Sequence, residues 1–158
     1  MAQEIERKYL VRPGTWVPAS AGIHFVQGYL NSQKERVVRV RIEGDQARLT
    51  VKGLTTSLTR LEFDYPIPLA DATVLLEQLC ERPLIDKHRH IETFGDLTWE
   101  IDVFHGDNEG LVIAEVELTS EADVVSLPPW AGDDVSSDPR YFNSNLLTHP
   151  YRTWTTGR

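Results

Sequence analysis

The chain has 158 residues, 41% of them apolar, which is enough to bury the core of one globular domain that we expect to span residues 1–158. Sixteen basic and 24 acidic residues give a net charge of −8, which disfavours binding of nucleic acid or of an anionic membrane to the outer surface. The single cysteine, Cys80, excludes an intrachain disulfide and a Cys-rich zinc site. The sequence contains neither an apolar run of membrane-spanning length nor a signal-peptide pattern, so we expect a soluble cytoplasmic protein.

Alternation of apolar and polar residues, the pattern of half-buried β-strands, recurs in eight segments. In chain order, the predicted strands are Gln3–Val11, His24–Leu30, Arg36–Glu43, Gln46–Lys52, Arg60–Ile67, Leu84–Glu92, Asp96–Phe104 and Leu111–Thr119. The pair Gly44-Asp45 is typical of a tight turn, so the third and fourth strands should form a hairpin. The last three strands are separated by short glycine-containing turns and should form a meander.

Between the fifth and sixth strands the period changes to that of a helix. Asp71 is a candidate N-cap, and one apolar stripe follows at Ala72, Leu75, Leu76, Leu79 and Cys80. The helix should end at Arg82-Pro83, and a second, short helix is predicted at Arg140–Leu147. The predicted fold class is therefore α+β, mainly β.

Charged residues occupy the strand faces opposite to the apolar residues. Because alternate side chains share a face, the charges form pairs of one sign, such as Arg39/Arg41 and Glu115/Glu117. Like charges so placed lie about 7 Å apart, which is unfavourable without a counter-ion. Two interpretations follow: an antiparallel sheet with its charged face in water, or a closed barrel with its charges inside and its apolar faces covered by the helix and connections. In the barrel, the acidic pairs would bind hard divalent cations and the basic pairs a polyanion rich in phosphate oxygens.

The order of the charged motifs resembles that of the CYTH family of triphosphate tunnel metalloenzymes. The motifs are E-x-E-x-K, R-x-R, a single strand lysine, K-x-R, E-x-D and E-x-E, in that order. They are formed by Glu4/Glu6/Lys8, Arg39/Arg41, Lys52, Lys87/Arg89, Glu100/Asp102 and Glu115/Glu117. Residues 138–144 are also similar to the C-terminal segment of that family. A single E-x-E-x-K is a weak signal, but six motifs in the family's order are a specific one.

The resemblance implies an eight-stranded, closed antiparallel barrel with a charged interior, flanked by one main helix and a short C-terminal helix. It implies dependence on Mg²⁺ or Mn²⁺ and, as in many members, a homodimer. Carried over to this sequence, the phosphate-binding residues would be Lys8, Arg39, Arg41, Lys52, Lys87 and Arg89. The catalytic, metal-binding residues would be Glu4, Glu6, Glu115 and Glu117, with further metal ligands or their partners at Glu62, Glu100 and Asp102. Tyr29 would lie in the tunnel, and the segment near Tyr141 would close one mouth.

The function that we infer from the resemblance is metal-dependent hydrolysis of inorganic triphosphate to pyrophosphate and phosphate. Three alternatives remain: a thiamine- or nucleoside-triphosphatase, a class IV adenylyl cyclase, and a non-catalytic module that binds polyphosphate or nucleotides. An organic triphosphate would need an apolar shelf, for which the candidates are Trp16, Trp130 and Trp154. The presence of four metal-binding carboxylates, Glu4, Glu6, Glu115 and Glu117, disfavours the non-catalytic module, because a protein that only binds anions does not need them. We expect His88 and His90 on the barrel exterior, since they alternate with Lys87 and Arg89.

Overall fold

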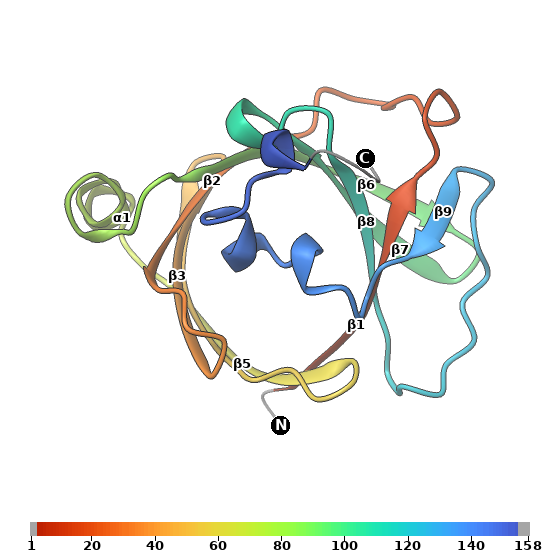
Figure 1. Ribbon diagram of the computed structural model, residues 1–158, viewed down its shortest axis with the longest axis horizontal. Helices are drawn as coiled ribbons and strands as arrows, with labels where there is room; N and C mark the ends of the chain where they lie inside the picture. The colour runs from red at the N-terminus through yellow and green to blue at the C-terminus, as the bar shows by residue number, and fades with distance from the viewer. Residues whose placement is uncertain (1–2, 155–158) are drawn as a thin grey trace.

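The computed structural model describes residues 3–154, and its strands form a closed antiparallel barrel with one added strand (Figure 1). Around the barrel the order is β5-β4-β3-β2-β6-β7-β8-β1, and pairing of β1 with β5 closes the ring. The strands are β1 (Gln3–Val11), β2 (Ile23–Asn31), β3 (Arg36–Glu43), β4 (Gln46–Gly53), β5 (Thr59–Pro66), β6 (Ile85–Phe94), β7 (Leu97–Phe104), β8 (Val112–Glu117) and β9 (Ala131–Asp134). The predicted eight-stranded barrel is confirmed; residues 1–2 and 155–158 of the predicted domain lie outside the described residues.

Local chemistry explains the predicted hairpin between β3 and β4. Gly44 has a φ of 64°, in the left-handed region that glycine enters without steric cost, and Glu43 pairs with Gln46 across the turn. The eight residues of β3 are then in register with the eight residues of β4. This register places the inward side chains of the two strands at matching heights in the barrel.

Two layers of the apolar core lie outside the barrel, against its outer face. One layer is covered by the helix, α1 (Leu69–Val74), which continues as a π-helical turn over Leu75–Leu79. Gly28 on β2 allows this close packing: a Cβ atom there would lie 2.7 Å from Leu84 and 2.9 Å from Cys80. The other layer centres on the fully buried Trp99 of β7. Because strand side chains alternate, this outward apolar packing turns the charged residues inward.

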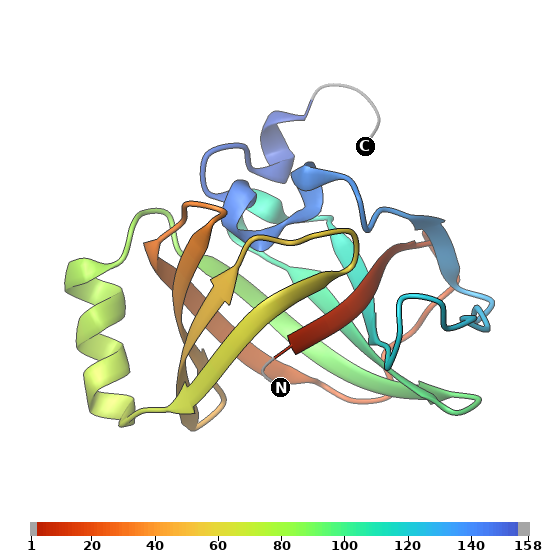
Figure 2. The ribbon, with the colours of Figure 1, turned by 90° about the horizontal axis from the view of Figure 1, so that it is seen from below.

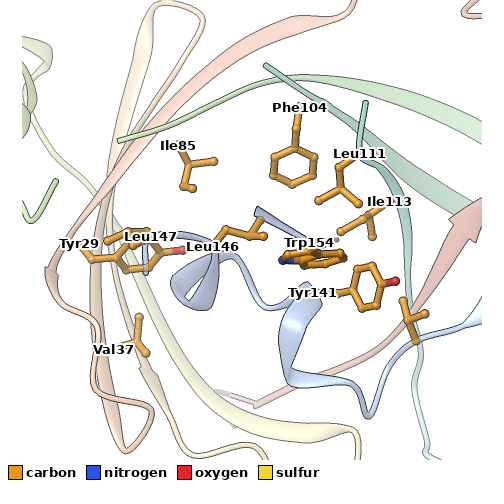
Figure 3. Close-up of a cluster of buried hydrophobic side chains, with 11 residues drawn as sticks. Tyr29, Val37, Ile85, Phe104, Leu111, Ile113, Tyr141, Leu146, Leu147 and Trp154 are labelled. Atoms are coloured by element: carbon orange, nitrogen blue, oxygen red, sulfur yellow. The ribbon is translucent and has the colours of Figure 1, made fainter. Parts of the chain in front are cut away.

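The C-terminal residues 139–154, which we call the plug, close one end of the barrel. Figure 1 looks along the barrel, with the plug inside the ring, and Figure 2 shows it covering one end. Its apolar side chains pack against inward residues of the strand ends, as Figure 3 shows. From the plug come Tyr141, Leu146, Leu147 and Trp154, and from the barrel Tyr29, Val37, Ile85, Phe104 and Ile113. Burial of this many large apolar side chains holds the plug in place.

The plug contains three 3₁₀ turns, Pro139–Tyr141, Asn143–Leu146 and Tyr151–Thr153. The first two lie where the sequence predicted one short helix, and they are separate. Phe142 between them has an extended backbone, with φ −73° and ψ 129°. Asn143 is a poor helix former, and its side chain hydrogen-bonds to Gln27 and Lys87 of the barrel instead of within the plug. The plug nevertheless lies where the resemblance placed it, at one mouth of the barrel.

Two further features differ from the prediction. β9, which pairs with the end of β1, was missed because its four residues follow a proline- and glycine-rich stretch. The outer face of β5 is not covered: Leu61, Phe63 and Tyr65 keep 51%, 42% and 54% of their surface exposed. Among the residues that the structure describes, no helix combines the length and the apolar character needed to cross a membrane.

Candidate active site

A cavity of about 230 Å³ lies inside the barrel, between the plug and the opposite mouth. Inward side chains of the strands form its wall, and Phe142, Asn143 and Ser144 of the plug form its closed end. Its basic residues are Lys8, Arg39, Arg41, Lys52, Arg60, Lys87 and Arg89, and its acidic residues are Glu4, Glu6, Glu62, Asp64, Glu100, Glu115 and Glu117. The structure thus brings together every predicted site residue except Asp102 and Tyr141, which do not line the cavity.

The basic side chains on one side of the cavity repel one another. Arg41 and Arg89 lie on the ring of Phe25, with their guanidinium carbons 4.7 and 4.8 Å from its centre. Burial and the charges of Arg39 and Arg89 lower the pKa of Arg41 to about 10. The Nε atoms of Arg39 and Arg41 are buried without a hydrogen-bond partner among the described residues. A polyanion would relieve both the repulsion and the missing hydrogen bonds.

Asp102 holds two of these cations in place from behind the cavity wall. Its Oδ2 accepts hydrogen bonds from Lys87 Nζ (2.7 Å) and Arg89 Nη2 (2.9 Å), and its Oδ1 from Arg89 Nε (2.8 Å). Burial raises the pKa of this fully buried carboxyl, but Arg89 and Lys87 outweigh it and the net pKa is lowered. Both oxygens of Asp102 are therefore occupied by cations, which favours a role as partner of Lys87 and Arg89 over that of a metal ligand.

Glu6 and Glu115 form a carboxyl pair on the neighbouring strands β1 and β8. Burial, and then the charges of Glu115 and Glu4, raise the pKa of Glu6 well above its usual value. Burial opposes ionisation of Glu115 too, but Lys8, Arg89 and a hydrogen bond from Glu6 lower its pKa to about 2. With no cation bound, these opposite shifts favour a protonated Glu6 beside an ionised Glu115.

Glu4 and Glu62 form a second carboxyl pair, bridged by Lys52. The Nζ atom of Lys52 lies 3.1 Å from Glu4 Oε1 and 3.3 Å from Glu62 Oε2. Burial raises the pKa of Glu4, but Lys52 outweighs it and lowers the value to about 2. Burial and the hydrogen bond to Glu4 raise the pKa of Glu62 to about 7. The cavity therefore contains two carboxyl pairs in which one member has a raised pKa and the other a lowered pKa.

The raised pKa of Glu62 predicts how the stability of the metal-free protein changes with pH. A carboxyl whose pKa is higher in the folded state binds its proton more tightly there, so its contribution to stability is full below about pH 4.5 and is lost as the pH rises through about 7. We expect Glu62→Gln to remove this loss, so that urea unfolding in EDTA differs less between pH 5 and pH 8 than in the unsubstituted protein. An equal pH dependence in both proteins would contradict the assignment.

Two cavity residues on β5, Arg60 and Asp64, were not among the predicted site residues. Asp64 accepts hydrogen bonds from Arg48 Nε (2.8 Å) and from the hydroxyl of Thr50 (2.9 Å), which in turn lies 3.3 Å from Arg39 Nη2. Arg60 donates its Nε to the carbonyl of Gly53. The alternation of β5, which places both residues on the face of Glu62, was the signal that could have found them.

The two predicted tyrosines lie at different places. Tyr29 lines the cavity, and its hydroxyl accepts a hydrogen bond from Gln27 Nε2 (3.2 Å). Tyr141 lies in the apolar contact of the plug, 5.2 Å from Trp154 between ring centres, away from the cavity. Trp130 packs on Trp99. None of the three tryptophans proposed as a shelf lines the cavity.

The two strand histidines lie on the side of β6 opposite to Lys87 and Arg89, as predicted. His88 contacts His105, with 2.7 Å between Nδ1 and Nε2, and stacks on His24. His90 is nearly buried beneath Trp16.

Comparison with known proteins agrees with this architecture. The model of the CYTH domain matches residues 2–151. The chain is 46% identical to an inorganic triphosphatase of Acetivibrio thermocellus, over 98% of this chain and 99% of that protein. It is 33% identical to an inorganic triphosphatase of Nitrosomonas europaea, over 90% and 95% of the two chains. The crystal structure of an inorganic triphosphatase that is 31% identical superimposes with a TM-score of 0.66, over 93% of this chain and 95% of that one. The chain therefore belongs to the CYTH domain family.

Proposed function

We propose that the chain hydrolyses inorganic triphosphate to pyrophosphate and phosphate inside the barrel cavity. The observation that carries this proposal is the cavity lining, in which seven basic side chains face the carboxyl pairs Glu6/Glu115 and Glu4/Glu62. The names of the two relatives support inorganic triphosphate as the substrate. A triphosphate fits the lining, because its oxygens match the guanidinium and ammonium donors and the carboxyl pairs offer sites for the cations that accompany it.

The donor set of the carboxyl pairs fits Mg²⁺ or Mn²⁺. Both are hard cations that bind to carboxylate oxygen, and no thiol or imidazole lines the cavity. A cation would replace the proton on Glu6, or the one on Glu62. Within residues 3–154, no group of three potential ligands is close enough to enclose a metal ion. This agrees with Mg²⁺ binding through one or two carboxylates together with phosphate oxygens and water.

Hydrolysis of a phosphoanhydride depends mainly on positioning the chain and neutralising the transferred phosphoryl group. Lys8, Arg39 and Arg41 and the Lys87/Arg89 pair would bind phosphate oxygens, while Asp102 keeps Lys87 and Arg89 oriented. A bound metal ion would supply further charge neutralisation and a more acidic water. The carboxyl pairs would hold that ion, and the plug would exclude bulk water from the closed end.

The shape of the mouth opposite the plug favours organic triphosphates as a second candidate class of substrate. A second cavity, of about 720 Å³, opens there and shares Arg41, Asp64, Arg89 and Glu100 with the first. Half-exposed Ile23 and Ile91 lie at its rim and could support the organic part of a nucleotide or of thiamine triphosphate. The same opening would accommodate the substrate of an adenylyl cyclase.

A cytoplasmic location and a homodimer are further parts of the proposal. The only cysteine is buried under α1 and unpaired, which fits a reducing compartment. The exposed apolar stripe of Leu61, Phe63 and Tyr65 on β5 would be the surface that meets a second copy. Light scattering should then give twice the chain mass of 18.0 kDa.

The experiment that tests the proposed function is phosphate release from a substrate panel. We expect rapid, metal-dependent turnover of inorganic triphosphate, slower turnover of ATP and thiamine triphosphate, and none in EDTA. Pyrophosphate should remain as product, and cyclic AMP should not form. A preference for an organic triphosphate would show that inorganic triphosphate is not the main substrate. Formation of cyclic AMP would identify the protein as a cyclase. Binding of triphosphate without turnover would support the non-catalytic binding module.

A further inference from the structure

The plug contributes one polar side chain whose orientation is fixed by the barrel. Asn143 Oδ1 accepts a hydrogen bond from Lys87 Nζ at 2.8 Å and another from Gln27 Nε2 at 3.0 Å. Gln27 is fully buried and Lys87 is 1% exposed, so both donors belong to the rigid wall of the barrel. Asn143 itself lines the cavity at its closed end.

These contacts decide which atom of the Asn143 amide lies next to Lys87 and which one is left without a partner. An ammonium group only donates hydrogen bonds, so the Asn143 atom next to Lys87 must be the carbonyl oxygen. The amide nitrogen, Nδ2, then points away from Lys87 and has no hydrogen-bond partner among residues 3–154. Asn143 therefore presents an unused, neutral N–H donor beside the ammonium of Lys87.

The closed end leaves no way for a substrate to continue past Asn143. Behind it, Leu146 is fully buried and packs with Ile85 and Trp154 in the apolar cluster of the plug. The opening at the other end shares four residues with the cavity and has about 720 Å³, against about 30 Å³ for the small space beside Phe142. The wide opening is therefore the side from which a chain of phosphates can enter. The phosphate that enters first would stop against Asn143 and Lys87.

We propose that Asn143 is a substrate-binding residue that donates its Nδ2–H to a terminal phosphate oxygen, so that the cavity accepts only phosphate chains with an unesterified end. This inference rests on the proposed function and names the substrate class within it. Linear inorganic triphosphate satisfies the requirement, and a chain esterified at one end satisfies it with the ester group at the open mouth. A chain esterified at both ends cannot place a free phosphate at the plug.

Asn143→Asp tests the proposed hydrogen bond with the smallest change in shape. The carboxylate keeps an oxygen for Lys87 and Gln27 but replaces the N–H donor by a negative oxygen facing the phosphate. We expect roughly ten- to hundredfold weaker binding of inorganic triphosphate by calorimetry in EDTA, the range for loss of a hydrogen bond to a charged group. In Mg²⁺, KM for triphosphate should rise by a similar factor, with a smaller change in kcat.

Asn145→Asp is the matched control, because it adds the same charge to the same turn outside the cavity. Asn145 Nδ2 donates to the carbonyl of Pro139, so this variant also loses a hydrogen bond within the plug. We expect its KM and triphosphate affinity to stay within about twofold of the unsubstituted protein. Should Asn143→Asp fail to fold by circular dichroism, Asn143→Ala removes the donor without adding charge and should weaken binding about tenfold.

Diadenosine triphosphate, esterified at both ends, tests the substrate class directly. We expect no hydrolysis of it under conditions that turn over inorganic triphosphate. Three results would each overturn the inference. They are hydrolysis of diadenosine triphosphate, an unchanged affinity of Asn143→Asp for triphosphate, and no binding of triphosphate in EDTA by the unsubstituted protein. The experiments distinguish the failure of the two proposals. If the unsubstituted protein binds triphosphate tightly without hydrolysing it, and Asn143→Asp weakens that binding, only the proposed hydrolysis is wrong. If Asn143→Asp turns over triphosphate normally with an unchanged KM, only the role of Asn143 is wrong.

Discussion

Glu6→Gln is expected to lower the rate of inorganic triphosphate hydrolysis by about 10²-fold or more, without weakening the metal-free fold. Burial and the neighbouring Glu115 and Glu4 already keep Glu6 protonated when no cation is bound, since they raise its pKa well above the usual range. A neutral glutamine imitates that state closely. It cannot imitate the ionised carboxylate that would bind a cation together with Glu115, so activity should fall while stability does not.

The measurement combines steady-state phosphate release in Mg²⁺ or Mn²⁺ with urea unfolding in EDTA. Glu109→Gln is the control, because the side chain of Glu109 is 74% exposed at the surface. It should behave like the unsubstituted protein in both assays. Normal turnover by Glu6→Gln would remove Glu6 from the proposed metal-binding set, and a large loss of stability in EDTA would show that its proton has been assigned wrongly.

The barrel and the lining of its cavity could be predicted because strand alternation is a local property. Once Val38, Val40 and Ile42 are assigned to one face of β3, Arg39 and Arg41 must share the other, whatever the rest of the chain does. The same rule puts Arg60 and Asp64 beside Glu62. They were missed because the family motifs, rather than the alternation, were used to choose the site residues.

Contacts between distant segments could not be predicted in this way. Asn143 reaches Lys87, 56 positions earlier in the chain, only because the plug turns back into the barrel. Alternation placed Asp102 in the interior but could not show that Lys87 and Arg89 occupy both of its oxygens. The four residues of β9 are too few to show a period, so the pairing with β1 that makes them a strand was invisible in the sequence.

Asp102→Asn is expected to lower the free energy of unfolding at pH 7 by about 3–5 kcal/mol, the usual cost of removing one partner of a buried ion pair. Asp102 is fully buried and Lys87 almost so. The asparagine would leave Lys87 without its ion-pair partner and Arg89 with only the partly exposed Glu100. Burial already lowers the pKa of Lys87 to about 8 despite the opposing effect of Asp102. Without Asp102, Lys87 should lose its proton more readily, and triphosphate binding at neutral pH should weaken.

The pH dependence of this loss follows from the lowered pKa of Asp102. A carboxyl whose pKa is lower in the folded state contributes stability above its unfolded pKa, about 3.9, and that contribution is lost as the pH falls through the folded value. The difference in unfolding free energy between the two proteins should therefore be full at pH 7 and begin to shrink below about pH 4. Urea unfolding at a series of pH values measures it.

A matched surface pair separates the effect of burial from that of the substitution itself. Asp107 forms an ion pair with Arg152 at 3.0 Å, with 43% of the aspartate side chain and 64% of the arginine side chain exposed. Solvent screens such a pair, so Asp107→Asn should cost only about 0–1 kcal/mol at pH 7. If both substitutions cost the same, Asp102 does not stabilise Lys87 and Arg89 in the way proposed. If Asp102→Asn is far more costly and also weakens triphosphate binding, the phosphate-binding cations depend on this buried carboxylate for both their charge and their position.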